Sequence, residues 1–193
     1  MMGFCKKYTE FEIGEKFNYV GIRFFPTVFP VLFKVNAKEL SNNYSPLQPI
    51  ASETSNFIAS AFSINESLTA IKNKLDSHLI ELINAKETNL DERFKNALQL
   101  ILKNFGVINV QTELNVGLSP RQLRRYFDSY IGTTAKSFSQ VIRFQNILRA
   151  KPSSQSLKNN KIFYELGYYD QAHFIKEFKK FYGVTPAKAF AVQ

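Results

Sequence analysis

One helical segment occurs twice in this chain, and the repeat constrains the fold more than any other feature of the sequence. Residues 119–132 (SPRQLRRYFDSYIG) match residues 170–183 (DQAHFIKEFKKFYG) at an offset of 51. The matching positions are Leu123 with Phe174, Phe127 with Phe178, Tyr130 with Phe181, and Gly132 with Gly183. Apolar residues at i, i+4 and i+7 form one buried face of a helix, so the repeat predicts two similar helical units.

Both copies also carry the residues that begin and end a helix. Ser119 and Asp170 stand where an N-cap side chain accepts a backbone N–H. In the first copy Pro120 takes the first helical position and Gln122 completes a capping box. Glycines occupy a tight turn before each helix and the position after it: Gly117 and Gly132, then Gly167 and Gly183. With an apolar helical segment upstream of each turn, this order predicts two helix-turn-helix units.

The exposed faces of the two helices indicate what they bind. Arg and Gln near a helix N-terminus can read base edges in the major groove of DNA, and Lys farther along suits phosphates. We therefore expect base contacts from Arg121, Gln122, Arg124, Arg125, Gln171, His173 and Lys176. We expect phosphate contacts from Lys136, Arg143, Lys179 and Lys180. A solvated basic face has a similar composition, but its occurrence twice at one offset favours DNA contact.

A connecting helix is predicted over residues 134–151, ending at Pro152. Its inward positions are Phe138, Val141, Ile142 and Leu148. A rigid connector would hold the two exposed faces at a fixed separation. If that separation is near one turn of DNA, roughly 34 Å, one chain could occupy two successive major-groove segments.

Charge is distributed unevenly along the chain, and the distribution agrees with this interpretation. The net charge of the whole chain is +9. Residues 1–90 hold nine Lys and Arg against nine Asp and Glu, whereas residues 91–193 hold sixteen against seven. The whole excess therefore lies in the half that contains the repeat, as expected for a polyanion-binding module attached to a neutral region.

Composition excludes several other classes of protein. The single cysteine, Cys5, permits no intrachain disulfide and no cysteine-based metal cluster. No apolar run approaches the roughly 18 residues that a membrane-spanning helix needs, and the first residues are too polar for a secretion signal. We therefore expect a cytoplasmic protein of the bacterial type, without a cofactor or a metal site.

The region before the repeat, residues 1–88, predicts a small α+β or helical unit. Its apolar stretch favours a short strand over Tyr19–Phe25, and Pro46 and Pro49 indicate a loop. Ser63 and Glu66 have the spacing of a capping box. They would open a helix to about Lys86 with one apolar stripe: Leu68, Ile71, Leu75, Leu79 and Leu82. The stripe either packs within its own chain or forms the seam of a homodimer.

Residues 91–104 predict a further helix that opens the C-terminal domain of residues 89–193. Its expected buried residues are Phe94, Ala97, Leu98, Ile101 and Leu102, and Gly106 would terminate it. The fold class is therefore mainly α: two helix-turn-helix subdomains joined by a linker helix, preceded by the small N-terminal region.

Three segments resemble AraC/XylS-type transcription regulators. Residues 167–190 (GYYDQAHFIKEFKKFYGVTPAKAF) resemble the C-terminal signature of that family, residues 117–127 (GLSPRQLRRYF) its first recognition helix, and residues 143–148 (RFQNIL) its linker helix. The resemblance covers about residues 90–190. It implies that Arg121, Arg124 and Arg125 face one groove segment of DNA, and Gln171, His173 and Lys176 the next.

The chain departs from the family pattern in the helix that supports each recognition helix. A small Ala is usual there, but the second unit has Phe163 and the first has Glu113 or Leu114, in a segment about one residue short. Overpacking of such a crossing costs about 1–3 kcal/mol unless neighbours shift, so the tilt of the recognition helices should differ from the family's. The N-terminal region weakly resembles the end of the β-rich effector domain of one subgroup, as if most of that domain were missing.

Two other classes of function have to be compared with DNA binding: an enzyme and a basic interaction module. An enzyme would have to use Cys5, His78 or His173, and no nucleophile elbow, phosphate-binding glycine loop or metal-ligand spacing is present. A basic protein-interaction or membrane-surface module is the remaining alternative. Double-stranded DNA is the expected partner, with RNA polymerase and a second copy through the helix at residues 65–86 as further candidates. The sequence identifies no effector ligand.

Overall fold

The computed structural model describes residues 1–10, 15, 19–63, 65–86, 89–150 and 166–190. Within these ranges the fold is helical and contains no strand, only an isolated antiparallel bridge between Met2 and Tyr44. The helices are α1 (Val28–Phe33), α2 (Ala37–Leu40), α3 (Ser52–Ala61), α4 (Leu68–Asn84), α5 (Glu92–Lys103), α6 (Pro120–Tyr130), α7 (Ala135–Ala150), α10 (Gln171–Tyr182) and α11 (Pro186–Phe190). The predicted mainly α class is confirmed.

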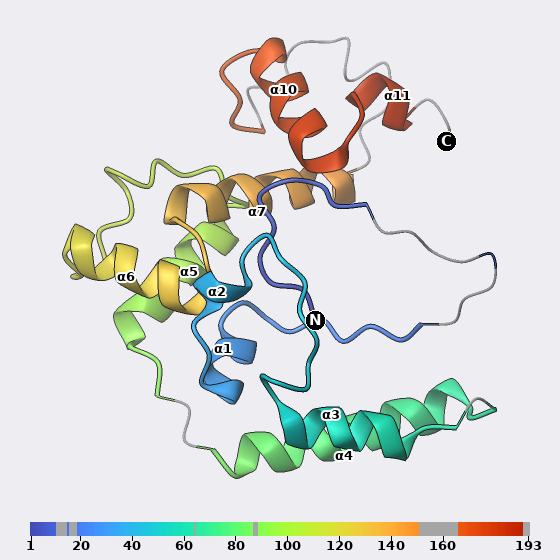
Figure 1. Cartoon of the computed structure of the whole chain (residues 1–193). Helices are drawn as coiled ribbons and strands as arrows, with labels where there is room; N and C mark the ends of the chain where they lie inside the picture. Colours follow the sequence, from blue (N-terminus) through green and yellow to red (C-terminus); the bar gives the residue numbers. More distant parts are fainter. Residues whose placement is uncertain (11–14, 16–18, 64, 87–88, 151–165, 191–193) are drawn as a thin grey trace.

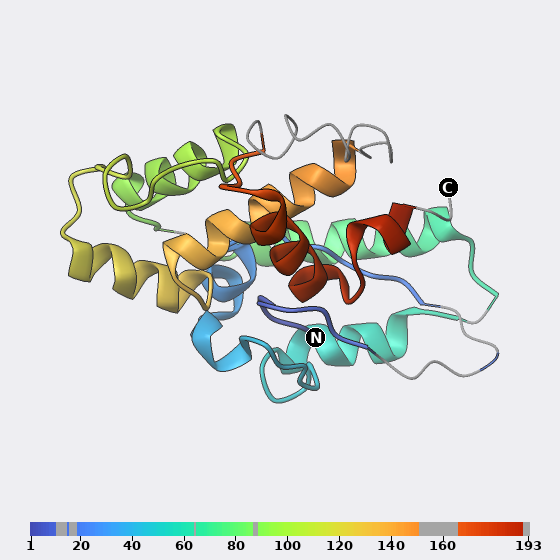
Figure 2. The ribbon, with the colours of Figure 1, turned by 90° about the horizontal axis from the view of Figure 1, so that it is seen from above.

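The linker helix α7 is the axis of the C-terminal half. It runs across the middle of Figure 1, with α5 and α6 beside its N-terminal end and α10 and α11 against its C-terminal half. From above, α10 lies across α7 whereas α6 lies beyond the other end of α7 (Figure 2). The predicted connecting helix is therefore confirmed, although residues 151–154, where it was expected to end, lie outside the described residues.

Two separate hydrophobic cores form along α7. Phe138 packs with Phe94 and Phe127 in the first core, where the Phe127 and Phe138 ring centroids are 5.9 Å apart. Phe144 belongs to the second core, and its ring centroid lies 5.4 Å from that of Phe178. Six positions on an α-helix correspond to a turn of about 240°, so Phe138 and Phe144 leave α7 on different sides. One helix thereby joins two subdomains.

The N-terminal region packs on the end of α6. Ser41, just after α2, donates its hydroxyl to the carbonyl oxygen of Gly132 at 2.5 Å. Gly132 has φ +84°, and a Cβ atom there would collide with the backbone of Ala37 in α2. The ring of Phe4 reaches the first core, 6.1 Å from Phe138 between centroids. The end of the first repeat helix is thus covered by residues from the neutral part of the chain.

The strand predicted over Tyr19–Phe25 is wrong. Residues 19–25 form neither helix nor strand, and α1 begins three residues later with Thr27 as its N-cap. A strand needs a neighbour to satisfy its backbone hydrogen bonds, and no extended segment pairs with residues 19–25 within the described part of the chain. The loop expected around Pro46 and Pro49 is confirmed.

The predicted start of α4 is also wrong. Glu66 does accept a hydrogen bond from the backbone N–H of Ser63, at 3.3 Å, but the two residues close a separate turn. Ser67 is the N-cap of α4 and accepts from the N–H of Ala70 at 3.2 Å. Ser63 and Ser67 are both possible N-caps, and the helix begins after Ser67, which directly precedes the apolar stripe.

The apolar stripe of α4 turns mostly toward its own chain. Leu82 is buried and Ile71, Leu75 and Leu79 are half-buried, whereas Leu68 is 77% exposed. Figure 1 shows α4 beside α3, and His78 of α4 accepts or donates a 3.0 Å hydrogen bond with Thr54 of α3. These contacts favour packing within the chain for most of the stripe. A homodimer through α4 stays a prediction.

Candidate nucleic-acid interface

The first repeat helix, α6, begins with the capping box that its sequence predicts. The hydroxyl of Ser119 accepts from the backbone N–H of Gln122 at 3.3 Å, and the Gln122 side chain accepts from the N–H of Ser119 at 3.0 Å. Pro120 stands at the first helical position. Phe127 is fully buried and its ring meets that of Phe94 edge-on, 5.1 Å between centroids. These contacts fix one face of α6 in the first core.

The opposite face of α6 carries the arginines expected to meet DNA. Arg121, Arg124 and Arg125 are exposed. Gln122 is half-buried, and its side-chain carbonyl is used in the cap. The Arg125 guanidinium lies over the ring of Tyr126, 5.5 Å from its centroid. A cluster of three exposed guanidinium groups on one turn of helix presents a concentrated positive charge to a partner.

The second repeat helix, α10, repeats this arrangement. Asp170 caps it by accepting from the N–H of His173 at 2.7 Å. Phe174 and Phe178 are buried in the second core. The predicted contact residues are all exposed: Gln171, His173, Lys176, Lys179 and Lys180. Gly117 and Gly167, in the turns before α6 and α10, have φ angles of +75° and +74°, so both turns use the left-handed conformation that favours glycine.

A groove of about 990 Å³ connects the two subdomains. Arg124 of α6, Lys136 of α7 and His173 of α10 all line it, and its lining residues include no Asp or Glu. Arg143 of α7 lines it as well, so basic side chains from three helices share one concave surface. Such a surface concentrates positive potential and suits a polyanion. The remaining predicted contact residues are not among its lining residues.

Arg143 corrects the predicted set of phosphate contacts. Its guanidinium donates to both carboxylate oxygens of Glu177, at 2.8 and 3.0 Å, and to the carbonyl oxygen of Gly167 at 2.9 Å. It also lies over the ring of Tyr168, 4.2 Å from the centroid. The Arg143 side chain is only 12% exposed. Its donors are used inside the protein, so it ties α7 to α10 instead of facing phosphates.

Glu177 and Tyr168 are positioning residues that are absent from the predicted set. The Tyr168 hydroxyl donates to Glu177 at 2.7 Å, and burial, reinforced by the Glu177 carboxylate, raises the pKa of Tyr168 far above its ordinary value of 10.0. A signal was present: Glu177 stands between Phe174 and Phe178 on the inward face of α10. A charged residue on a buried face requires a partner, and Arg143 is the one it finds.

The segment that supports α6 differs from expectation. Between α5 and Gly117 the structure has a single turn over residues 110–113 where a helical segment was predicted. Asn109 organises it: its carbonyl accepts from the N–H of Glu113 at 2.8 Å. Leu114, the residue after this turn, is buried in the first core. The corresponding segment of the second unit, with Phe163, lies outside the described residues.

The described residues contain no group of three His, Cys, Asp or Glu close enough to hold a metal ion. None of their helices is long and apolar enough to cross a membrane.

Comparison with known proteins matches both parts of the chain. Residues 115–191 match a family described as a helix-turn-helix domain, and residues 1–46 match a domain of unknown function, DUF6597. A similar protein is the probable thc operon regulatory protein of Rhodococcus erythropolis, 33% identical over 82 residues. The alignment covers 40% of this chain and 24% of that relative. No solved structure matches the chain.

The geometry and the family match agree on the C-terminal half: residues 115–191 are similar to a helix-turn-helix domain, and both of their capped helices have the expected form. The chain spans about a quarter of the length of the regulator-named relative that it matches.

Proposed function

We propose that this chain is a sequence-specific transcription regulator in which α6 and α10 read two successive major-groove segments of one DNA site. The observation that carries the proposal is the pair of capped helices, each with its apolar face in its own core and its basic face exposed. Because α7 contributes to both cores, the two basic faces keep a fixed relation to each other. The DNA site should then be bipartite.

Each helix contributes a different chemistry to this reading. Arg121, Arg124 and Arg125 of α6 offer forked guanidinium donors that match guanine O6 and N7. Gln171 of α10 is suited to adenine N6 and N7, and His173 and Lys176 extend the same exposed face. Lys136, Lys179 and Lys180 are the phosphate contacts in this proposal, because lysine ammonium groups neutralise charge without a fixed geometry.

Location and partners follow from the same proposal. The protein would act in the cytoplasm, where bacterial DNA lies, and would contact RNA polymerase if it activates transcription. A homodimer through α4 would place two DNA-binding domains on one operator. A selected DNA site with two-fold symmetry would indicate such a dimer.

The test begins with selection of bound sequences from random duplex DNA, followed by footprinting of wild type and two variants. Arg124→Gln should relax base preference in one half of the site and weaken DNA binding by about 1–3 kcal/mol. Lys176→Gln should act on the other half. Lys72→Gln, an exposed lysine of α4 paired with Asp76, is the matched control and should change neither half.

Three outcomes contradict the proposal. A footprint over one groove segment, with both variants altering the same bases, excludes two-segment reading. Selection that returns no enriched motif excludes sequence-specific binding. Tight binding to anionic vesicles without preference for any duplex would favour a membrane-surface module.

A further inference from the structure

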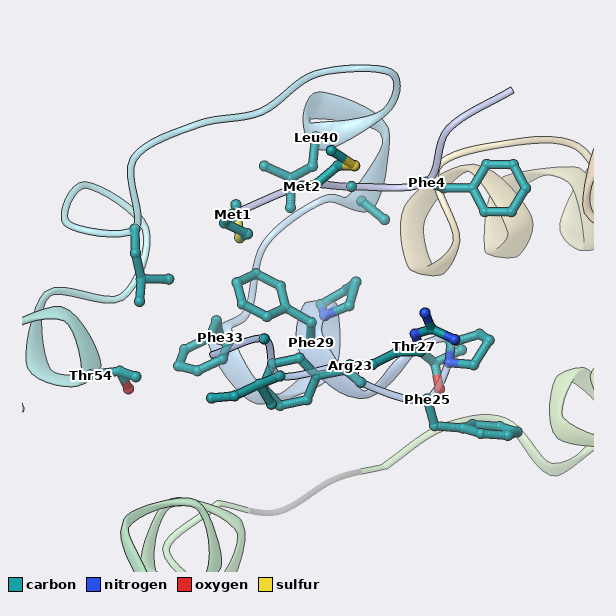
Figure 3. A pocket seen from close by; sticks show the side chains of 18 of the residues that line it. Met1, Met2, Phe4, Arg23, Phe25, Thr27, Phe29, Phe33, Leu40 and Thr54 are labelled. Carbon is teal, nitrogen blue, oxygen red and sulfur yellow. The ribbon is translucent and has the colours of Figure 1, made fainter. Parts of the chain in front are cut away.

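The first residues of the chain join the two subdomains a second time, separately from α7. Residues 2–8, here called the N-terminal strap, pass close to α7 and α10 (Figures 1 and 2). Figure 3 shows where the strap begins: Met2 lies beside Leu40 of α2, and the ring of Phe4 points away from Phe33 of α1. The strap therefore leaves the N-terminal region and runs toward the C-terminal half.

One end of the strap is anchored on the turn that follows α2. The side-chain oxygen of Asn42 accepts the backbone N–H of Lys6 at 2.8 Å, and the backbone N–H of Asn42 donates to the carbonyl oxygen of Phe4 at 2.9 Å. The hydroxyl of Ser41 lies 3.2 Å from the same carbonyl oxygen and also reaches that of Gly132, after α6. The Phe4 ring packs against the first core. This end of the strap belongs to the first subdomain.

The other end of the strap is attached to the C-terminal end of α10. The last carbonyl groups of an α-helix have no partner within the helix. The backbone N–H of Tyr8 donates to one of them, the carbonyl oxygen of Lys180, at 3.1 Å. Gly183, which ends α10, faces the Tyr8 ring, and a Cβ atom there would lie 3.2 Å from that ring. Tyr8 thus makes a polar and an apolar contact with the second subdomain.

The two attachments occupy equivalent places in the repeat. Gly132 and Gly183 match at the offset of 51, and both have a positive φ, of +84° and +92°. A Cβ atom on Gly132 would collide with the backbone of Ala37, and one on Gly183 would crowd Tyr8. The N-terminal region therefore covers the C-terminal ends of both α6 and α10. The opposite ends, which carry the expected base contacts, are not involved in these attachments.

The strap is too short to follow a large movement of one subdomain against the other. Four residues of extended chain span at most roughly 14 Å, so Phe4 and Tyr8 cannot separate further than that. A single helix such as α7 still allows bending between the bodies that it joins, because long helices are rarely straight. A second connection beside α7 restricts that bending.

We propose that the N-terminal strap fixes the separation of α6 and α10, and that Tyr8 is the positioning residue that holds α10. The strap and its anchor fall within residues 1–46, the part similar to DUF6597, so the proposal gives that segment a role in this chain. The consequence for DNA is a strict spacing between the two halves of the site, and this consequence rests on the proposed function. The restraint on the two helices does not.

The restraint is tested without DNA, by electron paramagnetic resonance distance measurement on the full chain. Spin labels on Arg121→Cys in α6 and Ala172→Cys in α10, with Cys5→Ser, should give one narrow distance distribution. Tyr8→Pro removes the ring and the N–H donor and should broaden that distribution. Tyr8→Ala removes the ring alone and should broaden it less. Thr9→Ala, an exposed neighbour outside the strap, is the matched control and should leave the width unchanged.

The consequence for DNA is measured as a spacing penalty. One base pair inserted between the two halves of the site moves them apart by about 3.4 Å and turns them by about 35°. Wild type should lose at least about tenfold in affinity for that longer site, and Tyr8→Pro about threefold or less, because a looser chain samples more arrangements. Tyr8→Pro should also bind the original site more weakly, since only a fraction of its molecules hold the required arrangement.

Each result decides a separate point. An unchanged distance distribution in Tyr8→Pro overturns the restraint and leaves the proposed function standing. Equal spacing penalties in wild type and Tyr8→Pro overturn the role of the strap in DNA reading, even where the distribution broadens. Absence of sequence-specific binding by the wild type contradicts the proposed function, whereas a broadened distribution still supports the restraint.

Discussion

Arg143 and Glu177 form the most buried ion pair among the described residues, with side chains 12% and 5% exposed. Removing two charges from water costs several kcal/mol per ion, and the pair recovers it only through good geometry and further hydrogen bonds. Both conditions hold here, because Tyr168 and the Gly167 carbonyl satisfy the remaining groups. The pair therefore selects one arrangement of α7 against α10.

Breaking the pair from one side should be costly. Arg143→Ala leaves Glu177 buried without a counter-charge, and we expect a loss of about 3–5 kcal/mol in the free energy of unfolding. Arg143→Met combined with Glu177→Met removes both charges and should recover most of that loss. Urea unfolding followed by circular dichroism measures both. If the double variant is as unstable as Arg143→Ala, the effect lies in packing and not in the unpaired charge.

Asp91 gives the chain a defined response to acid. It accepts hydrogen bonds from the Arg93 side chain, the Arg93 backbone N–H and the Tyr126 hydroxyl, and the Arg93 side chain above all holds the pKa of Asp91 below its usual 3.8. Because the folded pKa lies below the unfolded one, the carboxylate stabilises the fold above about pH 4 and this contribution is lost as pH falls through the folded pKa.

Asp91→Asn should therefore be less stable than wild type at pH 7 and lose less stability on acidification below about pH 4. Unfolding by urea at a series of pH values measures this. Asp76→Asn, on the exposed face of α4, is the control and should keep the wild-type slope. A slope in Asp91→Asn equal to that of wild type would show that the Arg93 contact does not persist in solution.

At the scale of elements, the glycine after α5 sets how closely two helices approach. Gly106 has φ +74°, and a Cβ atom there would collide with the Ser139 carbonyl oxygen and lie 2.6 Å from the Arg143 nitrogen, both in the backbone of α7. Backbone atoms of a packed helix cannot move aside as a flexible side chain does. The contact therefore fixes where α5 ends relative to α7.

Gly106→Ala should destabilise the chain by about 2–5 kcal/mol, because a positive φ costs roughly 1–2 kcal/mol and overpacking roughly 1–3 kcal/mol. Gly21→Ala is the matched control: a Cβ atom there meets nothing within 4 Å, so its free energy of unfolding should stay near the wild-type value. Thermal and urea unfolding compare the two. Equal stabilities would show that α7 yields at this contact.

The elements that sequence predicts well are those specified locally. The ends of α6 and α10 follow from Ser119, Asp170 and the glycines beside them, since caps and turns act within a few residues. The strand at residues 19–25 failed because strand formation depends on a partner elsewhere in the chain. The role of Arg143 was missed for the same reason: Glu177 is 34 residues away and meets it only in the folded chain.

At the scale of the whole molecule, the site was predicted in part. The exposed faces of α6 and α10 follow from helical periodicity. The groove shared by Arg124, Lys136 and His173 does not, because it depends on how three helices are oriented. A cavity of about 660 Å³ in the N-terminal half also escaped prediction, because residues as far apart in the sequence as Met1, Leu79 and Ile131 line it.

Charge at this scale predicts the salt dependence of DNA binding. With a net charge of +9 carried by residues 91–193, the logarithm of affinity should fall linearly with the logarithm of salt concentration, by about 0.9 per phosphate contact. Lys179→Gln and Lys180→Gln should each lower that slope by about 1 and weaken all sequences alike. Lys72→Gln is again the control. A slope unchanged in both α10 variants would remove these lysines from the interface.

The shared helix also restricts how such a chain can change in length. Phe138 and Phe144 belong to different cores, so one residue inserted between them would rotate the second subdomain by about 100° and shift it by about 1.5 Å. A local adjustment cannot restore the original angle between the two subdomains, because each core is packed against its own face of α7. Relatives that keep both cores should therefore conserve the number of residues between the two phenylalanines of α7, even where the chains differ in length elsewhere.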